Sequence, residues 1–343
     1  MTIEALKKWF YLGMTAIKLR QQPEREYGSG LTLLDTSEDT DNLGDFIIMR
    51  FCEEALKPLI ESEKTLSVPT HCIPSAELLK KLEQCDRKII CGTNILYPQM
   101  EYASIWKLPP TAEAYKDCIL MGAGWGYYSD KISLYTKIFY RLILNKKYLH
   151  AVRDMYTWNK LKHMGIENVV YTGCPTMWGL TPEFCEGIPE KKACYAVTTV
   201  TSYEQDRERD GYMIHTLCTC YEKVFVWPQG KDDREYILSL IKENEKITVL
   251  DRTLKAFEEV LKLSSIDYIG TRLHGGVMAL NAGKRSLIIA TDNRAEEIGK
   301  DTGLPILSRK HLKGALESRI YEDYKTEIHM PFENIDLWKK QFI

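Results

Sequence analysis

An arginine, a histidine and two glycines follow one apolar run and could together bind and activate an anion. Arg272 stands at the end of a strand expected over 266–271. His274, Gly275 and Gly276 open the helix expected next. Buried strands favour Val and Ile, so packing alone does not explain these residue types. Because a helix start offers free N–H groups and a positive dipole end, the stretch predicts a phosphate or carboxylate site. Arg272 supplies a planar fork for a carboxylate, and His274 a group that titrates near neutral pH.

A second polar stretch, "DTDNLGD", opens the first long helix after the apolar run over 31–36. Asn42, Gly44 and Asp45 would lie at the N-terminus of that helix, where Asn and Asp caps are favoured. The pattern leaves two interpretations open, a capping loop or a polar wall of a binding cleft.

Glycines also follow two neighbouring strands, in "CGTNIL" with Asn94 and in "MGAGWG". Glycine lets the backbone approach a ligand closely, although turn glycines have the same appearance. Neither stretch matches the GxGxxG fingerprint with an acidic residue about 20 positions on, which disfavours an NAD-dependent dehydrogenase. Arg153 ends a further strand, and Asp154 can cap the helix behind it. Arg153 therefore either pairs with a carboxylate or binds an anion.

Strand-like and helix-like segments alternate almost throughout the 343 residues. This alternation predicts an α/β fold of two Rossmann-like domains with parallel sheets facing a central cleft, where ligands meet the carboxyl ends of strands. A Pro- and Gly-rich linker over 174–194 separates the predicted domains, which span 1–185 and 186–325, and a C-terminal segment over 326–343 would pack back on the first. The strands are expected over 31–36, 88–93, 118–123, 150–154, 168–173, 194–200, 223–230, 246–251, 266–271 and 286–292.

Composition restricts the classes of partner. The net charge of −2 lacks the basic excess of a dedicated nucleic-acid binder. Ten cysteines occur without a CxxC pair, so no zinc-site spacing is present and a reducing, cytoplasmic location is expected. No apolar stretch approaches the roughly 20 residues that span a bilayer.

Two basic, apolar segments over 4–20 and 131–150 have the pattern of a membrane-surface helix. A core helix with a solvated basic face has the same pattern. The sequence leaves both interpretations open and allows peripheral contact with the inner face of a membrane, not insertion.

The ordered set "DNLGD", "CGTN", "GAGWG", "VRD", "VWPQGKDD" and "IGTRLHGGVMALNAGKRSLIIATDN" resembles the polysaccharide pyruvyl transferase family over roughly Leu31 to Leu307. The most specific part is the Arg-Leu-His stretch. The resemblance implies a GT-B-like fold and the transfer of pyruvate from phosphoenolpyruvate to a sugar as a ketal. The sugar would belong to a surface polysaccharide or a lipid-linked oligosaccharide precursor.

The family's Arg-Leu-His motif, which matters for donor binding and catalysis, corresponds to Arg272, Leu273 and His274. The C-terminal domain would hold the donor through these residues, and the N-terminal domain would hold the acceptor. His274 suits proton transfer, and Asp45 across the cleft would orient or deprotonate an acceptor hydroxyl. The scheme needs no metal and no cofactor besides the phosphoenolpyruvate co-substrate. Gly275, Gly276 and Arg153 complete the predicted donor site, and Asn42, Gly44, Asn94 and Gln229 the acceptor side or cleft.

Two other classes compete with this interpretation. A nucleotide-sugar-dependent GT-B glycosyltransferase also places cationic groups at a helix start of its second domain. A non-catalytic scaffold in polysaccharide assembly would keep the fold without responding to ligands.

Overall fold

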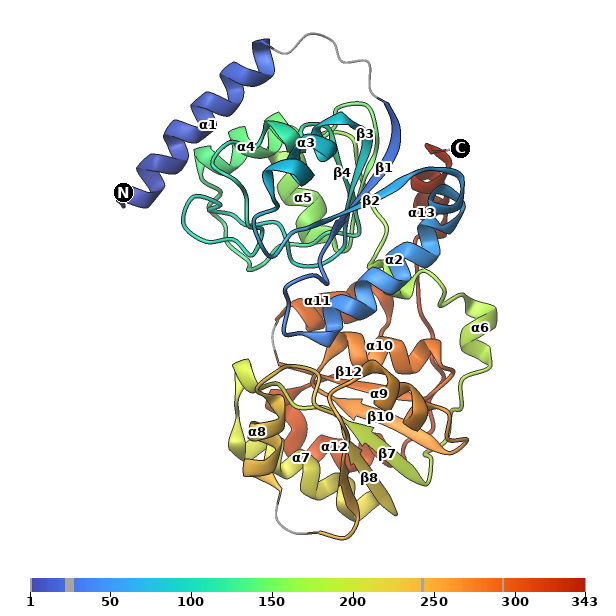
Figure 1. Cartoon of the computed structure of the whole chain (residues 1–343). Coiled ribbons are helices and arrows are strands. Elements are labelled where there is room, and N and C mark those ends of the chain that lie inside the picture. The colour runs from blue at the N-terminus through green and yellow to red at the C-terminus, as the bar shows by residue number, and fades with distance from the viewer. Residues whose placement is uncertain (1, 22–27, 242–243, 292, 343) are drawn as a thin grey trace. The chain divides into compact units, whose positions relative to one another are not determined.

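The computed structural model describes residues 2–21, 28–241, 244–291 and 293–342, which form two compact units (Figure 1). Unit 1 comprises Met1–Thr40, Ile48–Pro175 and Pro331–Ile343, and unit 2 comprises Asp41–Ile47 and Thr176–Met330. The chain thus leaves unit 1 between Pro175 and Thr176, not at the predicted residue 185. Asp41–Ile47, expected in the N-terminal domain, belongs to unit 2.

Unit 1 contains parallel strands whose carboxyl ends share one edge. β1 (Gly28–Asp35), β2 (Thr65–Pro69), β3 (Cys85–Cys91) and β4 (Cys118–Met121) form a sheet in the order β2-β1-β3-β4. β5 (His150–Val152) and β6 (Val169–Tyr171) form a second parallel pair. A parallel bridge from Ala123 to Val152 joins the end of β4 to β5. The residues after β3, β4 and β5 therefore lie in a row.

The helices of unit 1 bury their apolar faces against these strands. Trp125, Phe139 and Tyr140 belong to the hydrophobic core, and the helix with Phe139 and Tyr140 begins at Leu134. α13 is tied to unit 1, since Nδ2 of Asn334 donates to the carbonyl of Tyr171 at 2.9 Å. The helices are α1 (Ile3–Gln21), α2 (Leu43–Ser62, beginning in the unit 2 segment), α3 (Ala76–Gln84), α4 (Leu134–Ile143), α5 (Met155–His163) and α13 (Phe332–Lys340).

Unit 2 is a doubly wound parallel sheet in the order β12-β11-β10-β7-β8-β9. The order reverses between β7 and β10, and in such sheets ligands bind at the carboxyl side of this reversal. The strands are β7 (Tyr195–Thr198), β8 (Lys223–Val226), β9 (Ile247–Val249), β10 (Ile266–Gly270), β11 (Ser286–Ala290) and β12 (Ile306–Ser308). The helices are α6 (Pro182–Glu186), α7 (Arg207–Cys220), α8 (Asp233–Leu240), α9 (Leu254–Leu261), α10 (Leu273–Asn281), α11 (Asn293–Thr302) and α12 (Leu312–Tyr321).

Each of the ten predicted strand segments contains a strand, and the α/β prediction with parallel sheets is confirmed. Asp292, the last residue of one predicted strand, lies outside the described residues. β2 and β12, each at one edge of its sheet, have no counterpart among the predicted strands. An edge strand is paired on one side only, so it can be short and only partly apolar, and its pattern is weak.

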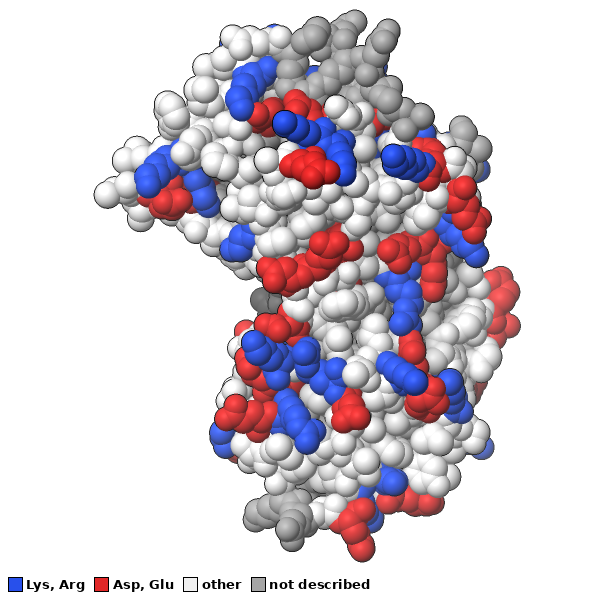
Figure 2. Space-filling model, in the orientation of Figure 1, with Lys and Arg blue, Asp and Glu red and all other residues white. Residues whose placement is uncertain are grey.

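Basic and acidic side chains are interspersed on the face that Figure 2 shows. This distribution agrees with the small net charge. No helix in the described part of the chain is long and apolar enough to cross a membrane.

Candidate active site

The backbone of Arg272 is fixed between two neighbouring strand exits of unit 2. Its N–H donates to Oγ1 of Thr199, which follows β7, at 3.1 Å. The hydroxyl of Tyr268 on β10 donates to the carbonyl of Arg272 at 2.7 Å and shares a 2.7 Å bond with the Thr199 hydroxyl. All three residues are buried. Arg272 therefore occupies the N-cap position of α10 in a defined orientation, at the reversal of strand order.

Asp233 holds the guanidinium fork of Arg272. Nε donates to Oδ2 of Asp233 at 3.1 Å, and Nη2 donates to Oδ1 at 2.6 Å and to Oδ2 at 2.7 Å. The guanidinium carbon also lies 4.9 Å from the ring centroid of Tyr203, within reach of a cation–π contact. Among the described residues Nη1 has no hydrogen-bond partner. The fork of Arg272, which is predicted to bind the donor, thus binds the carboxylate of Asp233. The Nη1 edge of the guanidinium could still contact a ligand.

Asp233, which is not among the predicted site residues, joins three adjacent strand exits. Besides Arg272 after β10, its carboxylate accepts from the N–H of Ser202 after β7 at 3.0 Å. After β8 it accepts from the N–H of Gly230 at 2.7 Å and of Gln229 at 3.2 Å. In the sequence, an acid at the start of α8 is indistinguishable from an ordinary helix-start acid.

The electrostatics of Asp233 follow from these contacts. Burial raises the pKa of its carboxyl, but the charge and hydrogen bonds of Arg272 and the N–H groups of Gly230 and Ser202 together lower that pKa below its ordinary value. A Cβ on Gly230 would lie 2.6 Å from Nη2 of Arg272, so only glycine fits there without a shift. The loop after β8 is therefore built around this ion pair.

The polar stretch at the start of α2 also meets the β8 exit. Nε2 of Gln229 donates to Oδ1 of Asn42 at 3.0 Å, and the N–H of Leu43 donates to the carbonyl of Gln229 at 3.1 Å. Nδ2 of Asn42 donates to Oδ2 of the buried Asp45 at 3.3 Å. A Cβ on Gly44 would lie 2.8 Å from Nε2 of Gln229. These contacts place Asn42, Gly44 and Asp45 in unit 2, whereas the sequence analysis assigns them to the opposite domain.

His274, Gly275 and Gly276 form the first turn of α10. The N–H of Gly276 donates to the carbonyl of Arg272 at 3.1 Å, so the amides of residues 273–275 precede the first intrahelical bond. No side chain caps this helix from the N-cap position. His274 is half-buried and both glycines are buried.

The two glycines of α10 have different surroundings. A Cβ on Gly276 would lie 2.5 Å from Cγ1 of Ile288 on β11, so this glycine permits close packing of helix and sheet. A Cβ on Gly275 would lie 3.3 Å from Oε1 of Gln229. That buried oxygen has no hydrogen-bond partner in the described parts of the chain. Oε1 of Gln229 is thus a buried acceptor next to the first turn of α10. Leu273, the middle residue of the Arg-Leu-His motif, is half-buried in the same turn.

The strand exits of unit 1 hold the other predicted arginine. Arg153 is buried, its Nε donates to Oδ2 of Asp154 at 3.1 Å, and Oδ1 of Asp154 accepts from the N–H of Thr157 at 2.7 Å. A Cβ on Gly124, after β4, would lie 2.3 Å from Nε of Arg153. Oδ1 of Asn94, after β3, is buried and makes no hydrogen bond to a described residue. Unit 1 thus brings Arg153 and Asn94 to one sheet edge.

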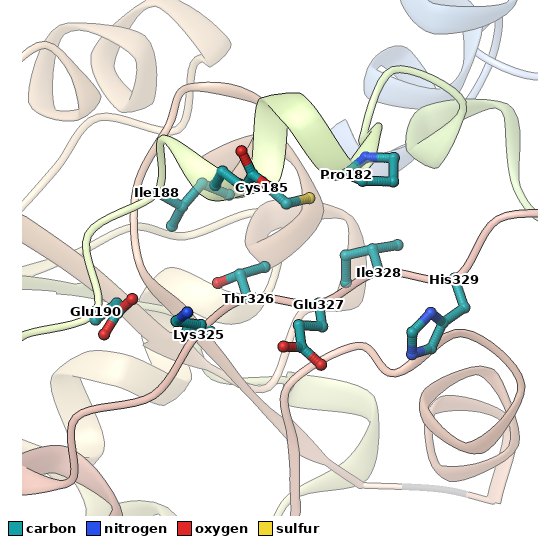
Figure 3. Close-up of a pocket in the computed structure, with 10 residues that line it drawn as sticks. Pro182, Cys185, Ile188, Glu190, Lys325, Thr326, Glu327, Ile328 and His329 are labelled. Carbon is teal, nitrogen blue, oxygen red and sulfur yellow. The ribbon is translucent and has the colours of Figure 1, made fainter.

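A cavity of about 450 Å³ lies elsewhere in unit 2, between α6 and the extended residues 325–329. Cys185 of α6 and Ile328, Glu327 and His329 of the extended segment are among the residues that line this cavity (Figure 3). None of the described site residues predicted from the sequence lines it. Nor does the described chain contain a group of three or more His, Cys, Asp or Glu side chains arranged to hold a metal ion.

Two doubly wound parallel units define a GT-B-like fold, and a solved structure with a TM-score above 0.5 shares it. The structure of MnaA with UDP from S. aureus has a TM-score of 0.52 at 12% identity, covering 87% of this chain and 91% of that chain. The UDP-GlcNAc 2-epimerase from Neisseria meningitidis, bound to UDP-GlcNAc, has a TM-score of 0.46 at 11% identity, covering 92% of this chain and 98% of that chain. SnogD, a glycosyltransferase from Streptomyces nogalater, has a TM-score of 0.43 at 11% identity over 92% of this chain and 95% of that chain. At 12% identity the likeness to MnaA shows the fold alone.

The family is shown by the sequence. The family model of polysaccharide pyruvyl transferase matches residues 20–293, and the chain belongs to that family, as its motifs predict. No curated protein sequence matches the chain.

Proposed function

We propose that the protein transfers pyruvate from phosphoenolpyruvate to a sugar of a surface polysaccharide or lipid-linked oligosaccharide precursor, forming a ketal. The observation that carries this proposal is the start of α10, where the fixed Arg272 supplies no side-chain cap and the amides of residues 273–275 precede the first intrahelical bond. Family membership supports a transferase that modifies polysaccharides. The geometry supports an anionic donor, because amides and a guanidinium edge converge at this helix start.

The donor would meet the amides of residues 273–275 and Nη1 of Arg272. Phosphoenolpyruvate carries a phosphate and a carboxylate, which suit an open helix start and an arginine edge respectively. Because Asp233 balances the charge of Arg272, the guanidinium acts here mainly as an oriented hydrogen-bond donor. The helix amides then supply much of the attraction for the phosphate.

The reaction requires two hydroxyl groups and two kinds of proton transfer. A proton adds to the enol methylene, one sugar hydroxyl adds to the neighbouring carbon, and a second hydroxyl displaces phosphate from it. Each hydroxyl loses one proton, so a diol and phosphoenolpyruvate yield a cyclic ketal and inorganic phosphate. His274 would protonate the methylene or hold the departing phosphate. Asp45 would orient or deprotonate an acceptor hydroxyl, and Asn42 and Gln229 would position Asp45.

The test is incubation of the full chain with phosphoenolpyruvate and a panel of aryl or lipid-linked glycosides. Phosphate release together with the mass gain of a pyruvate ketal supports the proposal. Thermal unfolding with each donor separates the competing classes. Stabilisation by a nucleotide sugar and not by phosphoenolpyruvate would instead indicate a glycosyltransferase, and no response to either would indicate a scaffold.

A further inference from the structure

Helix α1 (Ile3–Gln21) is anchored to unit 1 by one of its faces. Ala5, Leu12 and Thr15 are buried on this face. Oγ1 of Thr15 accepts from the N–H of Ala112 at 3.0 Å, and Trp9 meets Tyr135 of α4 edge to face at 5.5 Å. The contacts of this buried face determine which side of α1 is exposed to solvent.

The outer face of α1, defined by Ile3, Leu6, Phe10 and Ile17, exposes large apolar side chains. These residues are 76%, 50%, 66% and 49% exposed respectively. Their spacing of i, i+3, i+7 and i+14 places them on one side of a helix. Single exposed apolar residues are ordinary, but an aligned row of four marks an interaction surface.

Cations flank this row. Lys7 and Arg20 are exposed and have no partner among the described residues. Lys8 and Lys18, by contrast, are engaged by the carbonyl of Met100 and the carboxylate of Glu113. Lys7 and Arg20 therefore remain to attract an anionic partner.

The other segment with the same sequence pattern behaves differently. On α4, the residues Tyr135, Phe139, Tyr140 and Ile143 are buried in the core of unit 1. The apolar side of α4 is a core face with solvated basic residues beyond it. On α4 only Leu134 is a largely exposed apolar residue, whereas α1 presents an aligned row of four, as far as the described residues of the two helices show.

We propose that the outer face of α1 docks on an anionic lipid membrane surface. An apolar row beside two cations that have no partner in the described part of the chain fits the boundary between head groups and acyl chains of such a membrane. A second copy of this chain is a poorer partner, because Lys7 and Arg20 of each copy would face like charges. The surface is independent of the donor site, so its test needs no catalytic activity.

The experiment is co-sedimentation of the full chain with vesicles of phosphatidylcholine, with and without phosphatidylglycerol. The chain should bind the anionic vesicles, and binding should fall with added salt. Leu6→Ser combined with Phe10→Ser should lower the partition coefficient at least about tenfold, since two large side chains lose their apolar burial. Lys7→Glu combined with Arg20→Glu should lower binding to anionic vesicles alone.

A control replaces two leucines elsewhere in the protein whose exposure matches that of Leu6. Leu238 on α8 and Leu337 on α13 are 52% and 51% exposed, and replacing both with Ser should leave vesicle binding unchanged. Circular dichroism should give the parent's unfolding curve for every variant. Equal binding by the Leu6 and Phe10 variant and the parent would overturn the proposal. So would absence of binding to anionic vesicles, or a dimer in light scattering that this variant converts to a monomer.

Discussion

Each unit places an arginine at the carboxyl end of a strand, yet the two helix starts differ. In unit 1, Asp154 follows Arg153 directly, and its carboxylate occupies the start of α5. In unit 2, the partner carboxylate comes from Asp233 on another helix, and the N-cap residue of α10, Arg272, does not cap that helix with its side chain. Asp154 both pairs with Arg153 and accepts from the first turn of α5, where an anion would bind. Asp233 pairs with Arg272 from α8 and does not cap α10. This difference supports the proposal that unit 2 binds the donor.

The largest expected effect concerns His274, which lies at the open helix start. His274→Ala should keep the fold and lose turnover by roughly 10²–10⁴-fold, as for a positioned acid or base. His274→Gln separates the roles: near-parental activity indicates phosphate positioning, and a loss equal to alanine's indicates proton transfer. His163→Ala, at the end of α5 in unit 1, is the control and should turn over normally. Parental rates for a folded His274→Ala would make the imidazole a structural residue.

The two carboxylates should differ in their effect on stability. Asp233→Ala leaves a buried guanidinium and three backbone N–H groups without their acceptor, and should cost roughly 3–5 kcal/mol of unfolding free energy. Asp154→Ala removes a helix cap and one bond to Arg153, and should cost roughly 1–2 kcal/mol. Urea unfolding measures both. Equal losses of unfolding free energy would contradict the different roles given to Asp233 and Asp154.

Donor affinity should distinguish the two arginines. Arg272→Lys keeps a charge but cannot bridge Asp233 and the donor at once, so phosphoenolpyruvate binding should weaken by about tenfold or more. Arg153→Lys, at the predicted second anion contact, should have a smaller effect of a few-fold. Calorimetry provides the measurement. If Arg272→Lys and Arg272→Ala both bind the donor as the parent does, the assignment of Arg272 is wrong.

The smallest effect concerns acid stability. The folded-state pKa of Asp233 is lowered, so its contribution is fully present above the unfolded carboxyl's pKa of about 3.9 and is lost as pH falls through the folded-state value. Asp233→Asn should therefore show a shallower fall of unfolding free energy than the parent below about pH 4. Denaturant titrations at several pH values test this, and identical slopes would exclude an ionised Asp233 as the cause.

The sequence predicts the parallel α/β fold because strand and helix periodicities are local properties. It also predicts the stretch around Arg272, because an arginine, a histidine and glycines are unusual after a buried strand. It could not predict Asp233 as the partner of Arg272, since that contact depends on which strands become neighbours. The sequence could not predict the unit to which Asn42 belongs for the same reason, because the contact of Asn42 with Gln229 links distant segments.

The hydroxyl of Tyr268 makes the structure at the end of β10 depend on pH in the alkaline range. Burial raises its pKa above the ordinary value of a phenol, and in the neutral form it donates to the carbonyl of Arg272. A phenolate has no proton to donate, so ionisation would repel that carbonyl and release the residue that begins α10. Neutral and ionised tyrosine absorb ultraviolet light differently. The difference in alkaline absorbance between the parent and Tyr268→Phe would therefore report, without a label, the pH at which this part of the protein loosens.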